Sequence, residues 1–238
     1  MAALLQVTDL SKHFGGFTAL DGVTVAVAQG ERYGLIGPNG SGKTTLINCV
    51  AGALRNEAGS IRFDGEEVSR LPAYRRTRKG IARSFQIPRP FRSMTVLENL
   101  LVPYEYVAHL KDRESEALAL DILRGMGLAD KASASTASLS QVELRKLELA
   151  RAMAARPKLL ISDECMAGLS GSEVDEVLKI LFRLNEAGIT IIMIEHIMQA
   201  VMRFSQRVVC LDAGRIIAEG APQAVVGNAD VQRAYLGA

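Results

Sequence analysis

The stretch of this sequence that decides the fold is Gly37-Pro38-Asn39-Gly40-Ser41-Gly42-Lys43-Thr44. The apolar run before it, residues 32–37, favours a β-strand, and a helical stretch begins at about Lys43. Glycines allow several backbone N–H groups to converge on one anion, because no Cβ blocks the approach. The helix that follows adds free N–H groups and a partial positive charge at its N-terminus. The pattern G-x-x-x-x-G-K-[ST] therefore predicts a loop that binds phosphate groups.

Two side chains at the end of this loop add the chemistry of a nucleoside triphosphate site. Lys43 can reach the β- and γ-phosphates, and the hydroxyl of Thr44 can ligate Mg²⁺. The alternative is a glycine-rich turn that matches by chance, but the strand before it and the helix after it are the context that the motif requires. A nucleotide site does not define a function by itself, because kinases, GTPases and several kinds of ATPase share it.

A second motif lies at the end of another apolar run, residues 159–162, which Asp163 and Glu164 follow directly. An aspartate at the end of a strand can hold Mg²⁺ through its water shell, and the next glutamate can polarise an attacking water. Taken alone, the pattern is explained equally well by a strand followed by a polar loop. Combined with the phosphate loop, it indicates a Walker B motif.

The remaining pattern predicts an α/β core with an antiparallel β portion at the front and a helical insertion in the middle. Thr95 is expected to cap the start of the insertion with Glu98. The expected strands are 4–7, 23–27, 32–37, 61–63, 159–162, 189–194, 208–211 and 215–218, the last two as a hairpin. The helical region spans about 95–155 and includes a helix over 111–126 and a loop over 133–138.

Composition excludes several classes of protein. The chain has 238 residues, of which 48% are hydrophobic and 23% charged, so a folded core is expected and disorder is excluded. The net charge of +2 argues against a protein that binds polyanions through bulk charge. The three widely spaced cysteines indicate neither a disulfide framework nor a metal site. We expect a soluble intracellular protein, because no apolar run reaches the ~18–20 residues of a membrane span and the start does not read as a signal peptide.

The order of these motifs resembles the ATP-binding-cassette (ABC) ATPase family, in particular the cassettes of branched-chain amino acid importers. The resemblance covers essentially the whole chain and is carried, beyond the two motifs above, by the segments 10–20, Ser84-Phe85-Gln86, 94–101, Ile194-Glu195-His196, 217–220 and 234–237. It implies a P-loop NTPase fold with a RecA-like parallel core, an antiparallel β subdomain and an inserted helical subdomain. The core and β subdomain would comprise residues 1–93 and 156–238, and the helical subdomain residues 94–155.

The resemblance also implies roles for individual residues. Glu164 would be the catalytic carboxylate, His196 the switch histidine that contacts the γ-phosphate, and Gln86 the glutamine that touches Mg²⁺ or the lytic water. Phe14 would stack on adenine, although a buried phenylalanine at a strand end explains it nearly as well. The implied metal ligands are Thr44, Gln86 and Asp163. The implied ATP-binding residues are Phe14, Gly37, Pro38, Asn39, Gly40, Ser41, Gly42, Lys43, Thr44, Thr45, Ser140, Gln141, Val142 and Glu143.

The signature motif departs from the family pattern. The usual Leu-Ser-Gly-Gly-Gln is here Leu139-Ser140-Gln141-Val142-Glu143. Ser140 and Glu143 still form the S-x-x-E pattern of a capping box, so helix N–H groups could face a γ-phosphate of the partner subunit. The β-branched Val142 could hold the backbone away from that phosphate, and Glu143 adds a negative charge. Two interpretations follow: a hydrolysing subunit, or a weakly or non-hydrolytic regulatory subunit of a heterodimer.

The segment 68–97 contains no acidic residue. Its basic residues are Arg70, Arg75, Arg76, Arg78, Lys79, Arg83, Arg89 and Arg92. We interpret them as a solvated face beside the groove for the transporter's cytoplasmic helices. Contact with nucleic acid or anionic lipid is the alternative, but no nucleic-acid motif accompanies the charges.

The partners that the resemblance implies are integral-membrane permease subunits, a second ATPase subunit, identical or not, and indirectly a periplasmic solute-binding protein. No nucleic-acid partner is expected. The protein would lie in the cytoplasm, peripherally on the inner face of the cell membrane. A soluble ABC ATPase of DNA repair or translation is a further alternative. It predicts long coiled-coil insertions or two cassettes in one chain, and this sequence has neither.

Overall fold

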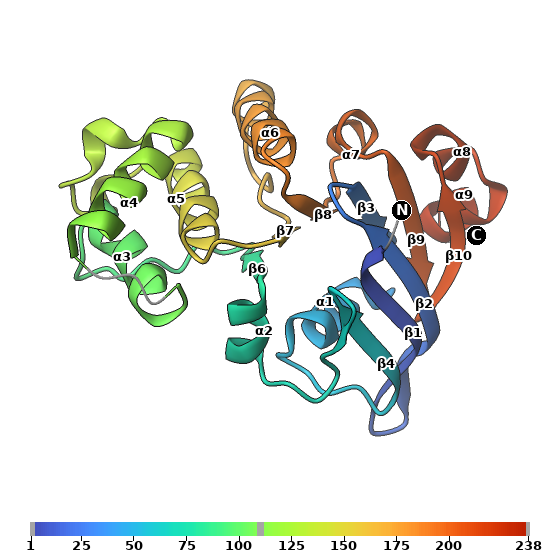
Figure 1. The fold of residues 1–238 in the computed structure, drawn as a ribbon. Helices are drawn as coiled ribbons and strands as arrows, with labels where there is room; N and C mark the ends of the chain where they lie inside the picture. The colour runs from blue at the N-terminus through green and yellow to red at the C-terminus, as the bar shows by residue number, and fades with distance from the viewer. Residues whose placement is uncertain (1–2, 109–111, 237–238) are drawn as a thin grey trace.

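The computed structural model describes residues 3–108 and 112–236, and its strands form two sheets (Figure 1). The antiparallel sheet has the order β2-β1-β4-β5, with β1 (Ala3–Phe14), β2 (Phe17–Ala28), β4 (Ala58–Phe63) and β5 (Glu66–Glu67). The larger sheet has the order β10-β9-β3-β8-β7-β6. It contains β3 (Arg32–Ile36), β6 (Ile81–Ser84), β7 (Leu159–Asp163), β8 (Thr190–Ile194), β9 (Arg207–Asp212) and β10 (Arg215–Gly220). Its pairs from β9 to β6 are parallel, and β10 is an antiparallel edge strand.

Helices cover both faces of the larger sheet. They are α1 (Lys43–Ala51), α2 (Ala73–Lys79), α3 (Val96–Tyr106), α4 (Asp112–Met126), α5 (Gln141–Ala154), α6 (Gly171–Glu186), α7 (Met198–Phe204), α8 (Pro222–Val226) and α9 (Ala229–Leu236). The predicted α/β fold class, with its antiparallel portion and helical insertion, is confirmed. No helix within the described residues has the length and apolar character that a membrane span requires.

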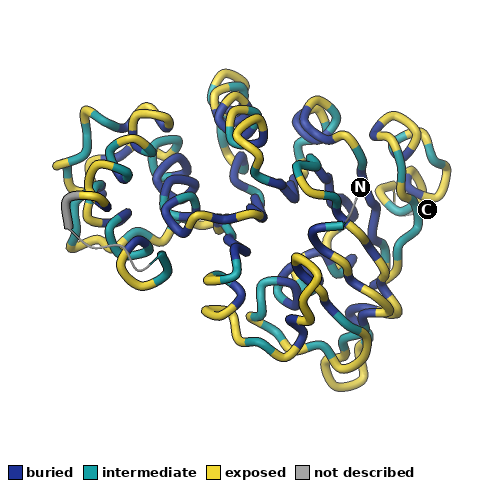
Figure 2. The backbone as a smooth tube through the Cα atoms, in the orientation of Figure 1, coloured by how far each residue is buried: buried dark blue, intermediate teal, exposed yellow. Residues whose placement is uncertain are grey.

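The core consists of two apolar clusters, one on each face of the larger sheet. The strands between them are largely buried along the backbone, drawn in dark blue (Figure 2). Leu35 and Ile194 belong to the cluster beneath α1 and the antiparallel sheet. Their chain neighbours Ile36 and Met193 belong to the cluster shared with α5, α6 and α7. Because both faces are covered, these strands are continuous apolar runs without polar alternation.

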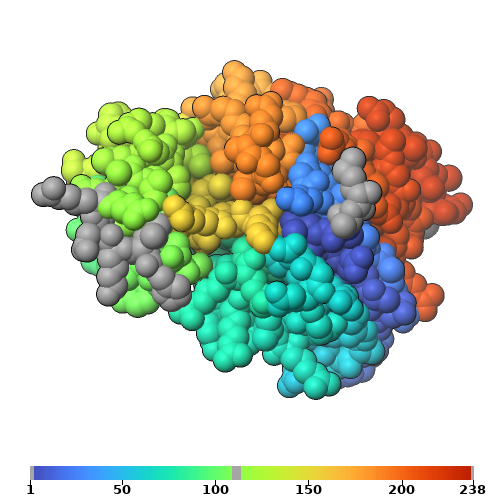
Figure 3. Space-filling view, in the orientation of Figure 1, coloured from blue at the N-terminus to red at the C-terminus, as the bar shows by residue number. Residues whose placement is uncertain are grey.

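The helical insertion packs against the same core. Its helices α3, α4 and α5 contact one another, and their buried residues join the cluster that also contains α6 and α7. In the space-filling view, the yellow atoms lie between the green part of the insertion and the orange, blue and teal parts of the molecule (Figure 3). The expected capping box between Thr95 and Glu98 starts α3. The start of the expected helix at Lys111 lies outside the described residues.

Several details differ from the sequence-based expectations, among them the second strand, which spans Phe17–Ala28 rather than 23–27. The first strand extends over Ala3–Phe14 rather than 4–7, since Asp9, at φ 50°, and several register shifts allow a polar segment to remain in the sheet. The strand β6 and the helix α2 were not expected. The expected loop 133–138 contains one 3₁₀ turn, Thr136–Ser138.

The parallel strands place their carboxyl ends along one edge of the sheet. The phosphate loop follows β3, Phe85-Gln86 follows β6, Asp163-Glu164 ends β7, and Glu195-His196 follows β8. Open α/β sheets bind ligands at this edge.

Candidate nucleotide-binding site

The phosphate loop runs from β3 into α1, and two of its glycines occupy positions that no other residue could fill. A Cβ on Gly37 would lie 2.1 Å from the carbonyl oxygen of Leu211, and one on Gly42 would lie 2.6 Å from that of Ala19. Both also have positive φ, at 147° and 106°. The loop is therefore closely packed against β9 and β2, with its outer residues Asn39 and Gly40 exposed.

Lys43 is buried and folds back over the loop. Its Nζ donates to the carbonyl oxygens of Gly37, at 2.7 Å, and Pro38, at 2.9 Å. Burial lowers the pKa of Lys43, and the nearby carboxylates of Glu164 and Asp163 oppose this effect. A nucleotide phosphate would supply the stronger counter-charge at this position.

The loop also contains a buried hydroxyl. The Oγ of Ser41 has no hydrogen-bond partner among the residues that the structure describes. Thr44, at the start of α1, is exposed and Thr45 half-buried. The first N–H groups of a helix have no partner within it, so the end of α1 offers donors for an anion.

Glu164 lies at the centre of the predicted catalytic residues. Its Oε2 accepts from Nε2 of Gln86 at 2.5 Å, and its Oε1 lies 2.6 Å from Nε2 of His196. Its own N–H donates to the carbonyl of Ile194, and its φ of 48° is unusual for a residue other than glycine. The structure thus brings together three side chains that the sequence separates by 78 and 32 positions.

Asp163 points to a different partner. Its carboxylate accepts from Nη2 of Arg83 at 2.5 Å, and Nη1 of the same arginine donates to Oδ1 of Asn48, at 2.6 Å, in α1. Arg83 therefore connects β6, β7 and the helix behind the phosphate loop. The pattern of the sequence did not indicate this network, because one basic residue in a basic segment carries no signal of its partner.

The loop that follows Glu164 is held from two sides. The buried carboxylate of Glu195 accepts from the N–H of Met166 at 2.9 Å. Arg145, buried in α5, donates to the carbonyl of Ala167 at 3.2 Å. Burial, together with the charge of Glu164, raises the pKa of Glu195 to about 7. The sequence indicated the contact between Glu195 and Met166 only through the position of Glu195 directly after an apolar strand.

The signature residues form the expected helix cap. The Oγ of Ser140 accepts from the N–H of Glu143 at 3.4 Å, and the Glu143 carboxylate accepts from the N–H of Ser140 at 2.8 Å. Lys131 also pairs with Glu143 at 2.6 Å, and these hydrogen bonds lower the pKa of that carboxyl group. Val142 packs partly against the core, and Gln141 is exposed. Within the described residues, these contacts do not bring the signature to the phosphate loop of the same chain.

Phe14 lies at the end of β1 and is 47% exposed, so the alternative of a buried phenylalanine is wrong. The ammonium group of Lys12 lies 5.3 Å from its ring centroid. The ring is accessible at the end of β1, as an aromatic platform for a flat ligand would need.

The interpretation of the basic segment as a solvated face is wrong for two of its residues. Arg76 is only 1% exposed and donates to the carbonyls of Cys49, Val50, Ser69 and Leu71. It thereby covers the C-terminal end of α1, where a cation is favoured. Arg83 is the second, through its ion pair with Asp163. Arg75, Arg78, Arg89 and Arg92 are exposed, as expected.

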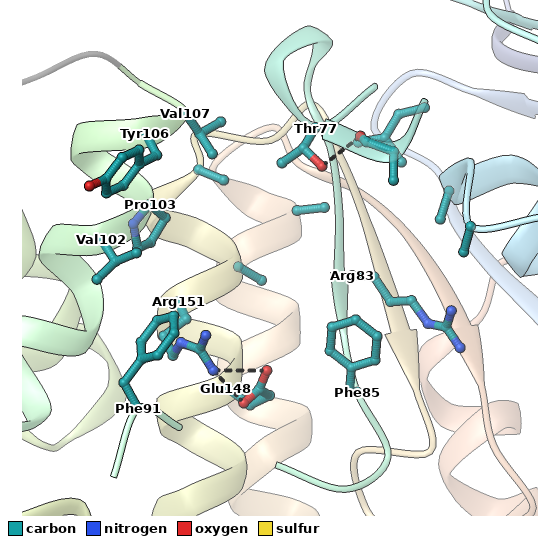
Figure 4. Close-up of a pocket in the computed structure, with 17 residues that line it drawn as sticks. Thr77, Arg83, Phe85, Phe91, Val102, Pro103, Tyr106, Val107, Glu148 and Arg151 are labelled. Atoms are coloured by element: carbon teal, nitrogen blue, oxygen red, sulfur yellow. Dashed lines mark hydrogen bonds and ion pairs between the residues drawn. The ribbon is translucent and has the colours of Figure 1, made fainter. Parts of the chain in front are cut away.

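A groove of about 350 Å³ lies beside the site, between the helical insertion and β6 with α2 (Figure 4). Phe85, directly before Gln86, lines one side, and Phe91, Val102 and Tyr106 line the other. The guanidinium of Arg151 lies 4.8 Å from the ring centroid of Phe91. The groove is mostly apolar, and one of its walls leads directly to the predicted catalytic residues.

A glycine-rich phosphate loop after β3 and paired carboxylates at the end of β7 define a P-loop nucleotide-binding protein. A family model described as "ABC transporter" matches residues 20–167, and one described as "Branched-chain amino acid ATP-binding cassette transporter" matches residues 215–238. The chain belongs to the ATP-binding cassettes of ABC transporters, and the resemblance inferred from the sequence is confirmed.

Relatives and solved structures agree with this assignment. The chain is 38% identical to the high-affinity branched-chain amino acid transport ATP-binding protein BraF of Pseudomonas aeruginosa, with 98% of each chain covered. It is 37% identical to LivG of Escherichia coli, described in the same terms, again over 98% of each chain. An ATP-binding cassette of an ABC transporter in its ADP conformation superposes with a TM-score of 0.92 over the full length of both chains, at 31% identity.

Proposed function

We propose that this chain is the ATP-hydrolysing subunit of an importer for branched-chain amino acids or related small molecules, working with a separate permease. The observation that carries the proposal is the convergence of Gln86 and His196 on Glu164, next to a loop with the geometry of a phosphate site. The substrate class is inferred from the relatives that carry this description along their whole length.

In the proposed reaction, Glu164 accepts a proton from the attacking water as general base. His196 and Gln86 orient its carboxylate, and His196 also contacts the γ-phosphate. Lys43 leaves the carbonyls of its own loop to pair with the β- and γ-phosphates. The residues Gly37, Pro38, Asn39, Gly40, Ser41, Gly42 and Thr45 surround the phosphates, and Phe14 stacks on adenine.

Mg²⁺ fits the residues present. The hydroxyl of Thr44, the carboxylate of Asp163 and the amide oxygen of Gln86 are hard oxygen donors, which this ion prefers together with phosphates and water. When bound, the ion neutralises charge on the phosphates. In the described structure Asp163 is paired with Arg83, so this pair would have to loosen for the carboxylate to serve the ion.

The second half of each site would come from another ATPase subunit, identical or not. Ser140, Gln141, Val142 and Glu143 would face the γ-phosphate of the partner. The capping contacts favour this role over the regulatory alternative, because Glu143 is neutralised by Lys131 and directed to the helix end. Steady-state turnover by the purified chain alone would rule out a non-hydrolytic subunit.

The groove would receive a cytoplasmic helix of the permease, which would hold the subunit at the inner face of the membrane. Residues 94–155 would form the helical subdomain that carries one wall of this groove. Replacing Val102 with arginine should abolish co-purification with the permease and leave turnover of the isolated chain intact. Val226→Arg, on α8 and away from the groove, is the matched control.

The decisive experiment is Glu164→Gln. This variant should bind ATP like the wild type and lose turnover by at least about 100-fold, because the amide cannot accept the proton. Glu186→Gln, an exposed position at the end of α6, is the matched control. Turnover like that of the wild type in Glu164→Gln would reject the assignment. Reconstitution with the permease and a leucine uptake assay would then test the substrate class.

A further inference from the structure

The C-terminal helix reaches the phosphate loop through one side chain. The backbone N–H of Gly37 donates a hydrogen bond to the phenol oxygen of Tyr235 over 2.8 Å, across 198 positions of sequence. Gly37 is the first residue of the phosphate loop, and Tyr235 lies in the last turn of α9. The bond joins the end of the chain directly to the loop that would hold the nucleotide.

Gly37 is also constrained at its other atoms. Its carbonyl oxygen accepts from Nζ of Lys43 at 2.7 Å. Its Cα faces the carbonyl of Leu211 so closely that a Cβ would lie 2.1 Å from that oxygen, and 2.7 Å from Oγ of Ser41. Tyr235 thus holds the N–H of Gly37, and the carbonyl of the same residue holds the ammonium group of Lys43. A displacement of Gly37 would move Lys43 with it.

The helix that carries Tyr235 is anchored independently of this bond. Val231 is buried, and Oδ1 of Asn228 accepts from the N–H of Asp230 at 2.8 Å at the helix start. Tyr235 is 41% exposed, and the partial burial of its phenol raises the pKa of that group. A neutral phenol oxygen can accept the N–H of Gly37.

We propose that Tyr235 is a positioning residue, which holds Gly37, and through it Lys43, in the arrangement that receives ATP. The inference rests on the proposed function, because it concerns how the ATP loop is organised before the nucleotide binds. Preorganisation of this kind lowers the cost of binding and acts on affinity more than on the chemical step.

The test is Tyr235→Phe in the full chain, which removes the hydroxyl and keeps the ring. Tyr74→Phe, an exposed tyrosine of α2, is the matched control. We expect KM for ATP and the Kd for a fluorescent ATP analogue to rise about 3- to 10-fold, as the net contribution of one hydrogen bond predicts. The value of kcat should stay within about twofold, and the melting temperature without nucleotide should fall by only a few degrees, as the loss of one hydrogen bond implies. Hydrogen exchange of the peptide containing Gly37 should become faster, and the control should show none of these changes.

Two outcomes would overturn the proposal. In the first, KM and the exchange of Gly37 stay at wild-type values. In the second, a larger fall in the melting temperature without nucleotide accompanies equal losses in binding and turnover, which indicates a merely structural contact. A wild-type chain that neither binds nor hydrolyses ATP would reject the proposed function instead. Normal wild-type turnover with unchanged KM in Tyr235→Phe would reject only the role of Tyr235.

Discussion

Nε2 of His196 lies 2.6 Å from Oε1 of Glu164, so a loop after β8 and the end of β7 meet at one carboxylate. Replacing His196 with alanine should leave Glu164 with Gln86 as its remaining side-chain partner. We expect kcat to fall by about 100-fold or more, because the general base loses its orientation, whereas ATP affinity should change little. Phosphate release and equilibrium ATP binding measure the two effects separately. A loss confined to ATP binding would contradict this role.

Arg76 should matter for stability and little for catalysis. Replacement by methionine approximately keeps the volume of the side chain and removes the guanidinium donors to the carbonyls of Cys49, Val50, Ser69 and Leu71. We expect the free energy of unfolding to fall by about 3 kcal/mol or more, as for other buried networks that lose a charged donor. Urea denaturation measures the change. Arg75→Met, at the exposed neighbouring position, should stay within about 0.5 kcal/mol of the wild type.

The parts of the fold that follow from local rules could be predicted from the sequence. The strand, loop and helix around Lys43 follow from glycine geometry and apolar patterning. The caps at Thr95 and Ser140 follow from the S/T-x-x-E spacing, and both capping boxes are present. The hairpin turn at Ala213 and Gly214, both with positive φ, follows from turn chemistry.

The contacts that depend on topology could not be predicted. The strand β6 has four residues, one of them an arginine, so neither its length nor its pattern distinguishes it from a loop. Its place beside β7 brings Arg83 to Asp163. The bond from Gly37 to Tyr235 likewise depends on how the last helix packs. The family resemblance supplied the positions of Gln86 and His196, but the geometry that joins them to Glu164 needed the structure.

Val142, which stands where the family signature has glycine, should affect the stability of the protein more than its ATP turnover. Val142 packs its side chain partly against the core, so its backbone, rather than its side chain, would face a partner's nucleotide. We expect Val142→Gly to leave kcat within about twofold and to lower the free energy of unfolding by about 1–2 kcal/mol, through lost packing and the poor helix propensity of glycine. A rise in kcat of several-fold would show that the side chain limits hydrolysis. ATPase assays and urea denaturation of the same preparation provide both readouts.

Glu195 should make the stability of the protein depend on pH. Its carboxylate interacts with Glu164, His196 and Cys165, and Arg145 donates to Ala167 in the loop that this carboxylate holds. The folded-state pKa of about 7 exceeds the ordinary value of 4.5, so the folded chain binds more protons than the unfolded one between these limits. The stabilisation is complete below pH 4.5 and is lost as the pH rises through 7. The difference between the two pKa values corresponds to at most about 3 kcal/mol.

Glu195→Gln retains an oxygen that can accept from Met166 and has no proton to lose. We therefore expect the wild type to lose stability relative to Glu195→Gln between pH 5 and 8, in urea denaturation without nucleotide and with EDTA. Parallel stability curves for the two proteins would contradict the raised pKa.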